Sequence, residues 1–446
     1  MGACPAHRDG AVVSARRVAF DVLRQVTGEG AYANLALAKR LAVAGLDSRD
    51  AALVTELVAG TCRLMGTYDR IIEAAGGRAL GSLQPAVVDL LRLGTHQLLG
   101  MDVKRHAAVG TTVELARGTV GQRVTGVVNA ILRKVAARTL DEWTDHLASG
   151  ADEREALALR GHHPRWIVDA YAALLPTEEL PAALAANNVN PTPTLVVRPG
   201  LAEVADLLDA TPTPFSPFGA TSTRPPGEQP LVRDGRAGVQ DEGSQLVAWA
   251  LARADAPEGP WLDMCAGPGG KAALLAGLAR RDGRWLLASE AQEHRARLVR
   301  QALSAYPDGT VTITADGTAP AWDAAFARIM VDAPCTGLGA LRRRPESRWR
   351  RSPDDVTALG GLQRSLLRHA VESLRPGGVV AYVTCSPHRA ETVEVVDDVL
   401  AEMPDARRLH APDLLPEVPD CALGDDVQLW PHRHGTDAMY LALLTR

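Results

Sequence analysis

Trp261-Leu262-Asp263-Met264-Cys265-Ala266-Gly267-Pro268-Gly269-Gly270-Lys271 is a short apolar run followed by a glycine-rich turn and then by a helical pattern. Glycines in such a turn let the backbone approach a ligand closely, and the N–H groups that begin the helix can bind a carboxylate or phosphate. The stretch is neither a Walker loop nor a G-x-G-x-x-G fingerprint. Taken alone, it is also compatible with a plain tight connection between a strand and a helix.

The chain after this stretch alternates apolar runs with helical patterns. Further strands are expected at residues 285–290, 311–315, 328–332 and 379–384, with helices at 271–279 and 291–303 between them. This alternation of strands and helices predicts an α/β fold with a doubly wound, Rossmann-like parallel sheet and right-handed crossovers. Residues 427–430 and 439–444 are expected to form edge strands.

The N-terminal part, residues 1–145, predicts an all-helical domain. Val18, Val22, Leu23 and Val26 recur at helical spacing, and Pro85 suits a first helical position. About five short amphipathic helices are expected to form a bundle.

Residues 146–238 are read as a middle region, with a strand at 194–198, and residues 239–446 as the catalytic domain. The proline-rich segment 209–230 is expected to be a loop or partly disordered. His162 and His163 are expected to pack or cap rather than bind metal, because the sequence offers no partner ligand near them.

Composition narrows the class of protein. The 446 residues are 46% hydrophobic and 23% charged, which is typical of folded globular domains. The N-terminus lacks a signal-peptide core, and no apolar run reaches the roughly 20 residues of a membrane helix. We therefore expect a cytosolic protein. A monomer is assumed, although the sequence carries no signal for the oligomeric state.

The charge is uneven along the chain. Residues 1–150 carry 18 Lys+Arg against 14 Asp+Glu, whereas residues 151–446 carry 30 against 39. Nucleic-acid contacts would therefore depend on local basic patches. The six cysteines are widely spaced, which argues against metal and disulfide frameworks, and Cys4, Cys62 and Cys421 are expected to be structural.

Two other cysteines follow predicted strands. Cys335 lies in Asp332-Ala333-Pro334-Cys335-Thr336, and Cys385 lies in Thr384-Cys385-Ser386. Strand C-termini line the ligand crevice of an open α/β sheet. A lone buried cysteine is usually an inert core residue, but two thiols at such a crevice favour a nucleophilic site.

Acidic residues also end the predicted strands. Glu290 is placed to accept both hydroxyls of a ribose, and Asp316 to accept from an adenine amino group. With Asp263 and Asp332, they mark four successive strand tips. This pattern suits a nucleoside cofactor, although each residue singly can cap a helix instead.

The chain resembles two known families over nearly its whole length. The N-terminal part is similar to the NusB-type RNA-binding helical domain in Arg16–Leu23, Tyr32-Ala33-Asn34, Thr55–Gly60, Leu91–Gly94 and Val128–Arg133. The rest resembles the S-adenosylmethionine-dependent RNA (cytosine-5) methyltransferases, in particular the Fmu/Sun group that acts on 16S ribosomal RNA. The matching motifs are Gln240-Asp241-Glu242-Gly243-Ser244-Gln245, residues 263–271, Asp316-Gly317-Thr318, residues 332–337 and Thr384-Cys385-Ser386.

The resemblance implies roles for individual residues. It assigns Cys385 the attack on cytosine C6 and places Cys335 at release of the product. Asp332 is expected to hydrogen-bond the base, and Lys271 to orient Asp332 or Cys385. The implied S-adenosylmethionine site comprises Cys265, Ala266, Gly267, Pro268, Gly269, Gly270, Lys271, Glu290, Asp316 and Asp332.

An arginine-rich run follows Cys335 and is a candidate RNA contact. Its arginines could grip phosphates while Trp349 stacks on a base, although a charge run is often only a solvated face. The candidate residues are Arg342, Arg343, Arg344, Arg348, Trp349, Arg350 and Arg351.

Two departures from the family pattern concern substrate contacts. Arg198-Pro199-Gly200 lacks the Asn of a common Arg-x-Asn, and Gly435-Thr436-Asp437-Ala438-Met439-Tyr440 replaces Gly-Thr-Asp-Gly-Phe-Phe. Methylation of cytosine C5 in 16S rRNA is the leading hypothesis. The same chemistry on transfer RNA, or a non-catalytic NusB-like RNA-binding or antitermination factor, remains open.

Overall fold

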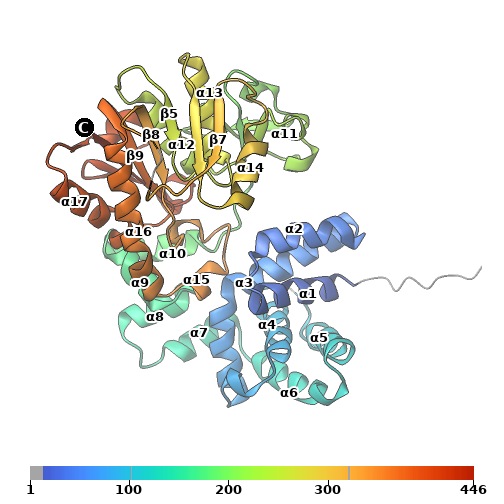
Figure 1. Cartoon of the computed structure of the whole chain (residues 1–446). Coiled ribbons are helices and arrows are strands. Elements are labelled where there is room, and N and C mark those ends of the chain that lie inside the picture. Colours follow the sequence, from blue (N-terminus) through green and yellow to red (C-terminus); the bar gives the residue numbers. More distant parts are fainter. Residues whose placement is uncertain (1–13, 102, 320–321) are drawn as a thin grey trace, which may run out of the picture. The chain divides into compact units, whose positions relative to one another are not determined.

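The computed structural model describes residues 14–101, 103–319 and 322–446. The expectations about a leader segment and about Cys4 therefore lie outside the described residues. Residue contacts divide the chain into unit 1, Met1–Val168 with Arg343–Arg350, and unit 2, Asp169–Arg342 with Arg351–Arg446 (Figure 1). The predicted middle region thus falls partly in each unit.

Unit 1 is helical throughout its described secondary structure, as the hydrophobic periodicity predicts. Pro85 is the first residue of α4, as expected, but α3 spans 29 residues and is not a short helix. The helices are α1 Ala15–Gly28, α2 Ala33–Ala44, α3 Ser48–Gly76, α4 Pro85–Leu99, α5 Arg105–Thr119, α6 Thr125–Val135, α7 Leu140–Ala148, α8 Glu153–Gly161 and α15 Ser347–Arg350. The boundary after Val168 falls within α9 Arg165–Ala172.

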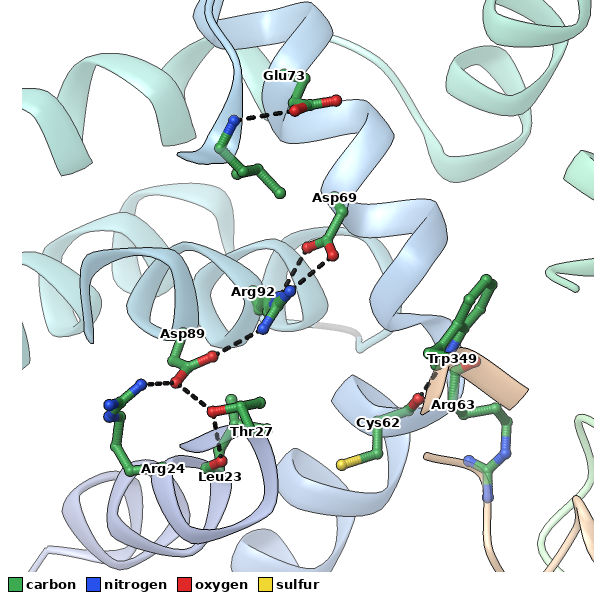
Figure 2. A network of polar contacts seen from close by, with 11 residues as sticks. Leu23, Arg24, Thr27, Cys62, Arg63, Asp69, Glu73, Asp89, Arg92 and Trp349 are labelled. Carbon is green, nitrogen blue, oxygen red and sulfur yellow. Dashed lines mark hydrogen bonds and ion pairs between the residues drawn. The ribbon is translucent and has the colours of Figure 1, made fainter. Parts of the chain in front are cut away.

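A charged network ties three of these helices together inside the bundle (Figure 2). Asp89 of α4, only 1% exposed, accepts hydrogen bonds from Arg24 and Thr27 of α1 and from Arg92. Arg92 also donates two hydrogen bonds to Asp69 of α3 at 2.7 Å. Because a buried carboxylate requires such partners, the network fixes how α1, α3 and α4 pack.

Unit 2 is built on a nine-stranded mixed sheet. Its main path runs β11-β12-β13-β9-β8-β5-β6-β7, and β10 pairs with β13. The five strands β5 to β9 are parallel, as predicted, and the Rossmann-like fold class is confirmed. The strands are β5 Trp261–Asp263, β6 Leu286–Glu290, β7 Thr310–Thr314, β8 Phe326–Asp332, β9 Leu374–Thr384, β10 Arg407–Leu409, β11 Ala422–Leu423, β12 Asp426–Gln428 and β13 Tyr440–Thr445.

The two C-terminal strands were predicted wrongly as edge strands. β13 pairs antiparallel with β9 over six residues and also with β12 and β10, and β12 itself lies between β11 and β13. All six residues of β13 are buried, because both faces of the strand are covered. This burial explains why the run Tyr440–Thr445 is mostly apolar.

Side chains of the central strands alternate between two cores. Val379, Ala381 and Val383 of β9 pack with α12 Glu242–Arg253, α13 Gly270–Arg281 and α14 Glu293–Leu303. Val380 and Tyr382 of β9 face the opposite core, with α16 Pro353–Glu372 and α17 Val393–Glu402. Helices therefore cover both faces of the sheet, and its strand ends are left to carry ligands.

The proline-rich segment is ordered, contrary to expectation. It forms strands of a four-stranded antiparallel sheet in the order β2-β3-β1-β4. Gln229 is fully buried and its side chain holds the backbone of Leu208 and the hydroxyl of Ser222, while Phe218 packs edge-on against Trp249. The elements are β1 Thr194–Val197, β2 Ala210–Pro212, β3 Gly219–Ser222, α11 Pro230–Arg233 and β4 Ala237–Val239.

Shorter elements complete the chain. They are α10 Leu180–Ala186, α18 Pro431–His434 and the 3-10 turns η1 Leu80–Ser82, η2 Gln122–Val124, η3 Thr177–Glu179, η4 Val204–Asp206, η5 Pro226–Glu228, η6 Leu338–Ala340, η7 Arg389–Glu391 and η8 Ala411–Leu414. Across the described residues, no helix is both long and apolar enough to cross a membrane. Over the same residues, no cluster of three or more His, Cys, Asp or Glu side chains suits a metal ion.

Candidate active site

The glycine-rich stretch connects β5 to α13 at the carboxyl end of the parallel strands. β5 lies between β6 and β8, so the chain order of neighbouring strands reverses there. Gly269 has φ +110°, and a Cβ at this position would lie 2.6 Å from Cβ of Ala302 and 3.1 Å from Cα of Val299. Only glycine fits, and α13 therefore begins close to the strand tips with its first N–H groups facing this end of the sheet.

Glu290, at the tip of β6, braces the same loop. Its carboxylate accepts hydrogen bonds from the backbone N–H of Gly267 at 3.0 Å and of Gln292 at 3.1 Å, and Arg295 lies 3.6 Å away. A Cβ on Gly267 would lie 2.2 Å from Oε2 of Glu290. Each carboxylate oxygen accepts about two hydrogen bonds, so acceptor capacity remains for a ligand.

Asp316, after β7, is exposed. Its Oδ1 accepts hydrogen bonds from the backbone N–H and the hydroxyl of Thr318, and these bonds lower the pKa of Asp316. The second oxygen can meet a polar ligand without a change of backbone conformation.

The two predicted thiols lie together. Cys335 follows β8 and Cys385 follows β9, which are paired strands, and the two sulfur atoms are 3.5 Å apart. Both cysteines are partly exposed. Fifty residues of sequence separate them, so the strand pairing alone brings them into contact.

Lys271 and Asp332 lie beside these thiols and form an ion pair, with Nζ of Lys271 donating to Oδ2 of Asp332 at 2.9 Å. Burial opposes the charged form of Lys271, but attraction by Asp332, Cys385 and Asp263 outweighs it and raises the pKa of Lys271. A fixed cation next to Cys385 favours its thiolate form. The expected grouping of Cys335, Cys385, Asp332 and Lys271 is present in the structure.

Asp263, the tip of β5, is more unusual than its sequence suggests. It is 1% exposed, and neither carboxylate oxygen has a hydrogen-bond partner of good geometry among the described residues. Burial, and after it the charge of Asp332, raises the pKa of Asp263 to about 8, and Lys271 offsets only part of this effect. Burial likewise raises the pKa of Cys265 in the adjoining loop.

Gly339 is a site residue that sequence reasoning missed. Its N–H donates to the carbonyl oxygen of Cys385 at 2.8 Å, and its own carbonyl accepts from Ala438 at 2.9 Å. A Cβ on Gly339 would lie 2.1 Å from the carbonyl oxygen of Ala438. Only its place two residues after Gly337 of the Asp-Ala-Pro-Cys-Thr-Gly motif offered a signal.

The two departures from the family pattern lie near this site. Arg198 is buried, and its guanidinium is 3.5 Å from the carbonyl oxygen of Gly270 in the glycine-rich loop. Asp437 is fully buried near Arg342 at 3.6 Å, and its backbone N–H donates to Asp241 at 3.0 Å. The motif that begins at Gln240 therefore helps to hold the chain around Ala438.

Much of the arginine-rich run lies inside the protein, whereas both an RNA contact and a solvated face require exposed side chains. Arg342 is 8% exposed and faces Asp241 and Asp437, and Arg348 is fully buried and donates to the carbonyl oxygen of His162. Arg350 donates to backbone carbonyls in unit 1, at Val26, Gly30 and Ala31. These three guanidinium groups are held within the protein.

Trp349 is also engaged inside unit 1 (Figure 2). Its indole N–H donates to the carbonyl oxygens of Cys62 and Arg63 in α3, at 3.0 and 3.2 Å. A Cβ on Gly66 would lie 2.3 Å from the Trp349 ring, so a glycine in α3 makes room for it. Of the seven candidate RNA contacts, Arg343 and Arg344 are exposed, and Arg351 is half-buried beside Asp355.

Unit 1 has its own hollow between α5 and α6. Its volume is about 450 Å³, and Arg105, His106, Asn129 and Arg133 line it together with small and apolar residues. Exposed cations beside a hollow suit the phosphates of a nucleic acid, and Asn and His can hydrogen-bond base edges.

A Rossmann-like sheet with a glycine-rich loop after β5 and acidic strand tips defines the class of α/β proteins that bind a nucleotide-type cofactor at the strand ends. The family model described as 16S rRNA methyltransferase RsmB/F matches residues 249–445, and that of the NusB family matches residues 13–137. The ribosomal RNA small subunit methyltransferase B of Vibrio cholerae is 31% identical, with 98% of each chain covered. The chain belongs to the RsmB/F family of rRNA methyltransferases and carries a NusB domain, which confirms the resemblance.

Two further similarities extend over nearly the whole chain. A putative methyltransferase from Mycobacterium tuberculosis is 49% identical, over 97% of this chain and 96% of the relative. The crystal structure of PH0851 has a TM-score of 0.79 and covers 96% of this chain and 97% of its own, at 20% identity. The latter similarity shows a shared fold alone.

Proposed function

We propose that this protein methylates C5 of a cytosine in 16S ribosomal RNA, with S-adenosylmethionine as the methyl donor. The observation that carries the proposal is the pair of thiols 3.5 Å apart at adjacent strand tips, next to the Lys271–Asp332 ion pair. The printed names of the full-length relatives, which concern small-subunit rRNA, support the choice of substrate.

The residues around β5 fit the cofactor. The glycines of the 265–271 loop permit close backbone approach, and Glu290, Asp316 and Asp332 offer carboxylates for hydroxyl and amino groups. When bound, S-adenosylmethionine supplies an electrophilic methyl group. These residues orient the cofactor, whereas the thiol of Cys385 activates the cytosine.

The thiol of Cys385 provides that activation. As a thiolate it adds to C6 of cytosine, forming a C–S bond and making C5 nucleophilic. Asp332 hydrogen-bonds the base edge and favours this addition, while Lys271 holds Asp332 in place. After methylation, Cys335 accepts the C5 proton, the C6–S bond breaks, and Cys385 leaves as a thiolate.

A single set of reactions tests this mechanism. Purified wild-type protein, Cys385→Ala and Cys335→Ala are incubated with labelled S-adenosylmethionine and 16S RNA free of ribosomal proteins. Cys385→Ala is expected to transfer no methyl group, and Cys335→Ala to accumulate a covalent RNA–protein adduct that survives denaturing gels. Methylation by Cys385→Ala would contradict the assignment of the nucleophile.

The substrate is tested by bisulfite sequencing of RNA from cells with and without the gene. Loss of one 16S rRNA methylcytosine supports the proposal. Loss of a tRNA methylcytosine with unchanged rRNA selects transfer RNA as the substrate, and no change in either RNA favours a non-catalytic RNA-binding factor.

A further inference from the structure

Glu391, in the turn η7, is a buried carboxylate to which no role has yet been given. It is fully buried, and its oxygens accept hydrogen bonds from the backbone N–H of Thr336 at 2.7 Å, the hydroxyl of Thr336 and the side chain of Gln363 at 3.3 Å. Among the described residues, no cation forms an ion pair with it. A buried carboxylate is stable only when it is hydrogen-bonded, so these bonds hold Glu391 and Thr336 in a fixed arrangement.

The partners of Glu391 flank Cys335 on both sides. Thr336 directly follows Cys335, and Gln363 also donates to the carbonyl oxygen of Pro334 at 2.8 Å. The backbone carbonyl of Glu391 accepts from the hydroxyl of Tyr382 in β9 at 2.9 Å. The backbone that carries Cys335 is thus anchored at two points to one carboxylate and to its hydrogen-bonding glutamine.

Charge is distributed unequally around the two thiols. Lys271, on α13, acts on Cys385. The hydrogen bond with Cys385, burial and the charge of Cys385 raise the pKa of Cys335 well above its usual range, and the charges of Glu391 and Asp332 add to this effect. His388, in the loop that carries Glu391, does not neutralise it at pH 7, because burial lowers the pKa of His388.

We propose that Glu391 is a positioning residue that assigns the two thiols their order of use: its hydrogen bonds hold Cys335 against Cys385, and its carboxylate adds a negative charge on the Cys335 side of the pair, so that Cys385 reacts first. This inference rests on the proposed function. Once Cys385 has become a thioether, it no longer bears a negative charge beside Cys335. Cys335 then releases its proton to water and takes up the C5 proton.

Two substitutions separate the charge of Glu391 from its hydrogen bonds. Glu391→Gln keeps an acceptor for the N–H of Thr336 but removes the charge, whereas Glu391→Ala removes both. Glu394→Gln is the matched control, because Glu394 follows the same turn but is exposed beside Arg389.

The charge is tested without RNA or cofactor. In full-length Cys385→Ser protein, the rate of iodoacetamide alkylation of Cys335 is followed by peptide mass spectrometry from pH 7 to 10. Adding Glu391→Gln is expected to raise the rate at pH 8 about threefold or more, because a fall of one pKa unit gives tenfold more thiolate of slightly lower nucleophilicity. Equal rates with and without Glu391→Gln would overturn the role of the charge.

The positioning role is tested on turnover. Glu391→Ala is expected to accumulate the covalent RNA adduct, like Cys335→Ala, while Glu391→Gln and Glu394→Gln are not. Normal turnover of Glu391→Ala without adduct would overturn the positioning role. If Glu391→Ala is not folded by circular dichroism, Thr336→Val, which removes one hydrogen bond to Glu391, replaces it with the same expectation. The alkylation result stands apart from any failure of the proposed methylation, since it uses no RNA.

Discussion

Replacement of Asp263 by Asn is expected to change how the stability of unit 2 depends on pH. The wild-type carboxyl has a pKa of about 8, raised by burial and by Asp332, against an ordinary value of 3.8. Because the folded-state pKa is the higher one, stability from this group is full below the unfolded pKa and is lost as pH rises toward 8. The amide that replaces the carboxyl in the variant does not titrate.

The magnitude follows from linkage. Each pH unit between the two pKa values costs the folded state about 1.36 kcal/mol. Between pH 5.5 and 7.5, wild type is therefore expected to lose about 2.7 kcal/mol of unfolding free energy relative to Asp263→Asn. The amide has the size of the carboxyl, so the variant removes the titration and changes little else.

The assay is a urea titration at both pH values, read by hydrogen-exchange protection of the peptide that contains β5. Because β5 belongs to unit 2, its exchange protection reports the unfolding of unit 2 separately from that of unit 1. Asp308→Asn is the control, since Asp308 is exposed in the same unit. If Asp263→Asn and wild type lose stability equally between pH 5.5 and 7.5, the carboxyl is ionised in the folded protein and the reasoning fails.

Three further outcomes are expected. Gly339→Ala should lower the methyl-transfer rate at least about 100-fold, because a methyl group 2.1 Å from the Ala438 carbonyl displaces the backbone that holds Cys385; an active variant would contradict this. Trp349→Ala should destabilise unit 1 by about 2–4 kcal/mol in a thermal unfolding assay, whereas an unchanged midpoint with weaker RNA binding would restore Trp349 as an RNA contact. Arg133→Glu should weaken RNA binding about tenfold in filter assays and flatten its salt dependence, while Lys39→Glu, an exposed cation on α2, should not; equal effects would show that only net charge matters.

The arginine-rich run shows where sequence reasoning stops. Composition identified a dense cluster of cations next to the Cys335 motif, and that pattern is shared by RNA-binding faces and by internal tethers. Arg348 is buried against a carbonyl oxygen, and Trp349 fills the space left by Gly66 in α3, about 280 residues earlier in the chain. Burial depends on what packs against a segment, which local sequence does not encode.

The proline-rich segment illustrates the same limit. Its prolines favoured a loop or partial disorder, but Phe218 and the buried Gln229 order it through contacts with α12 and with Leu208. The sequence also predicted β13 wrongly as an edge strand. Its true position depends on pairing with β9, which lies about 60 residues away in sequence, and local patterns carry no information on such pairing.

The sequence by itself determined the alternation of strands and helices, the glycine loop, the acidic strand tips and both thiols, because periodicity and motif spacing are local properties. Tertiary structure alone decided that the two sulfur atoms lie 3.5 Å apart, that the Asp263 carboxyl is buried, and that Glu391 binds the residue next to Cys335. These features depend on strand pairing and on burial, which bring distant residues together in a low-dielectric interior where a single charge has a large effect.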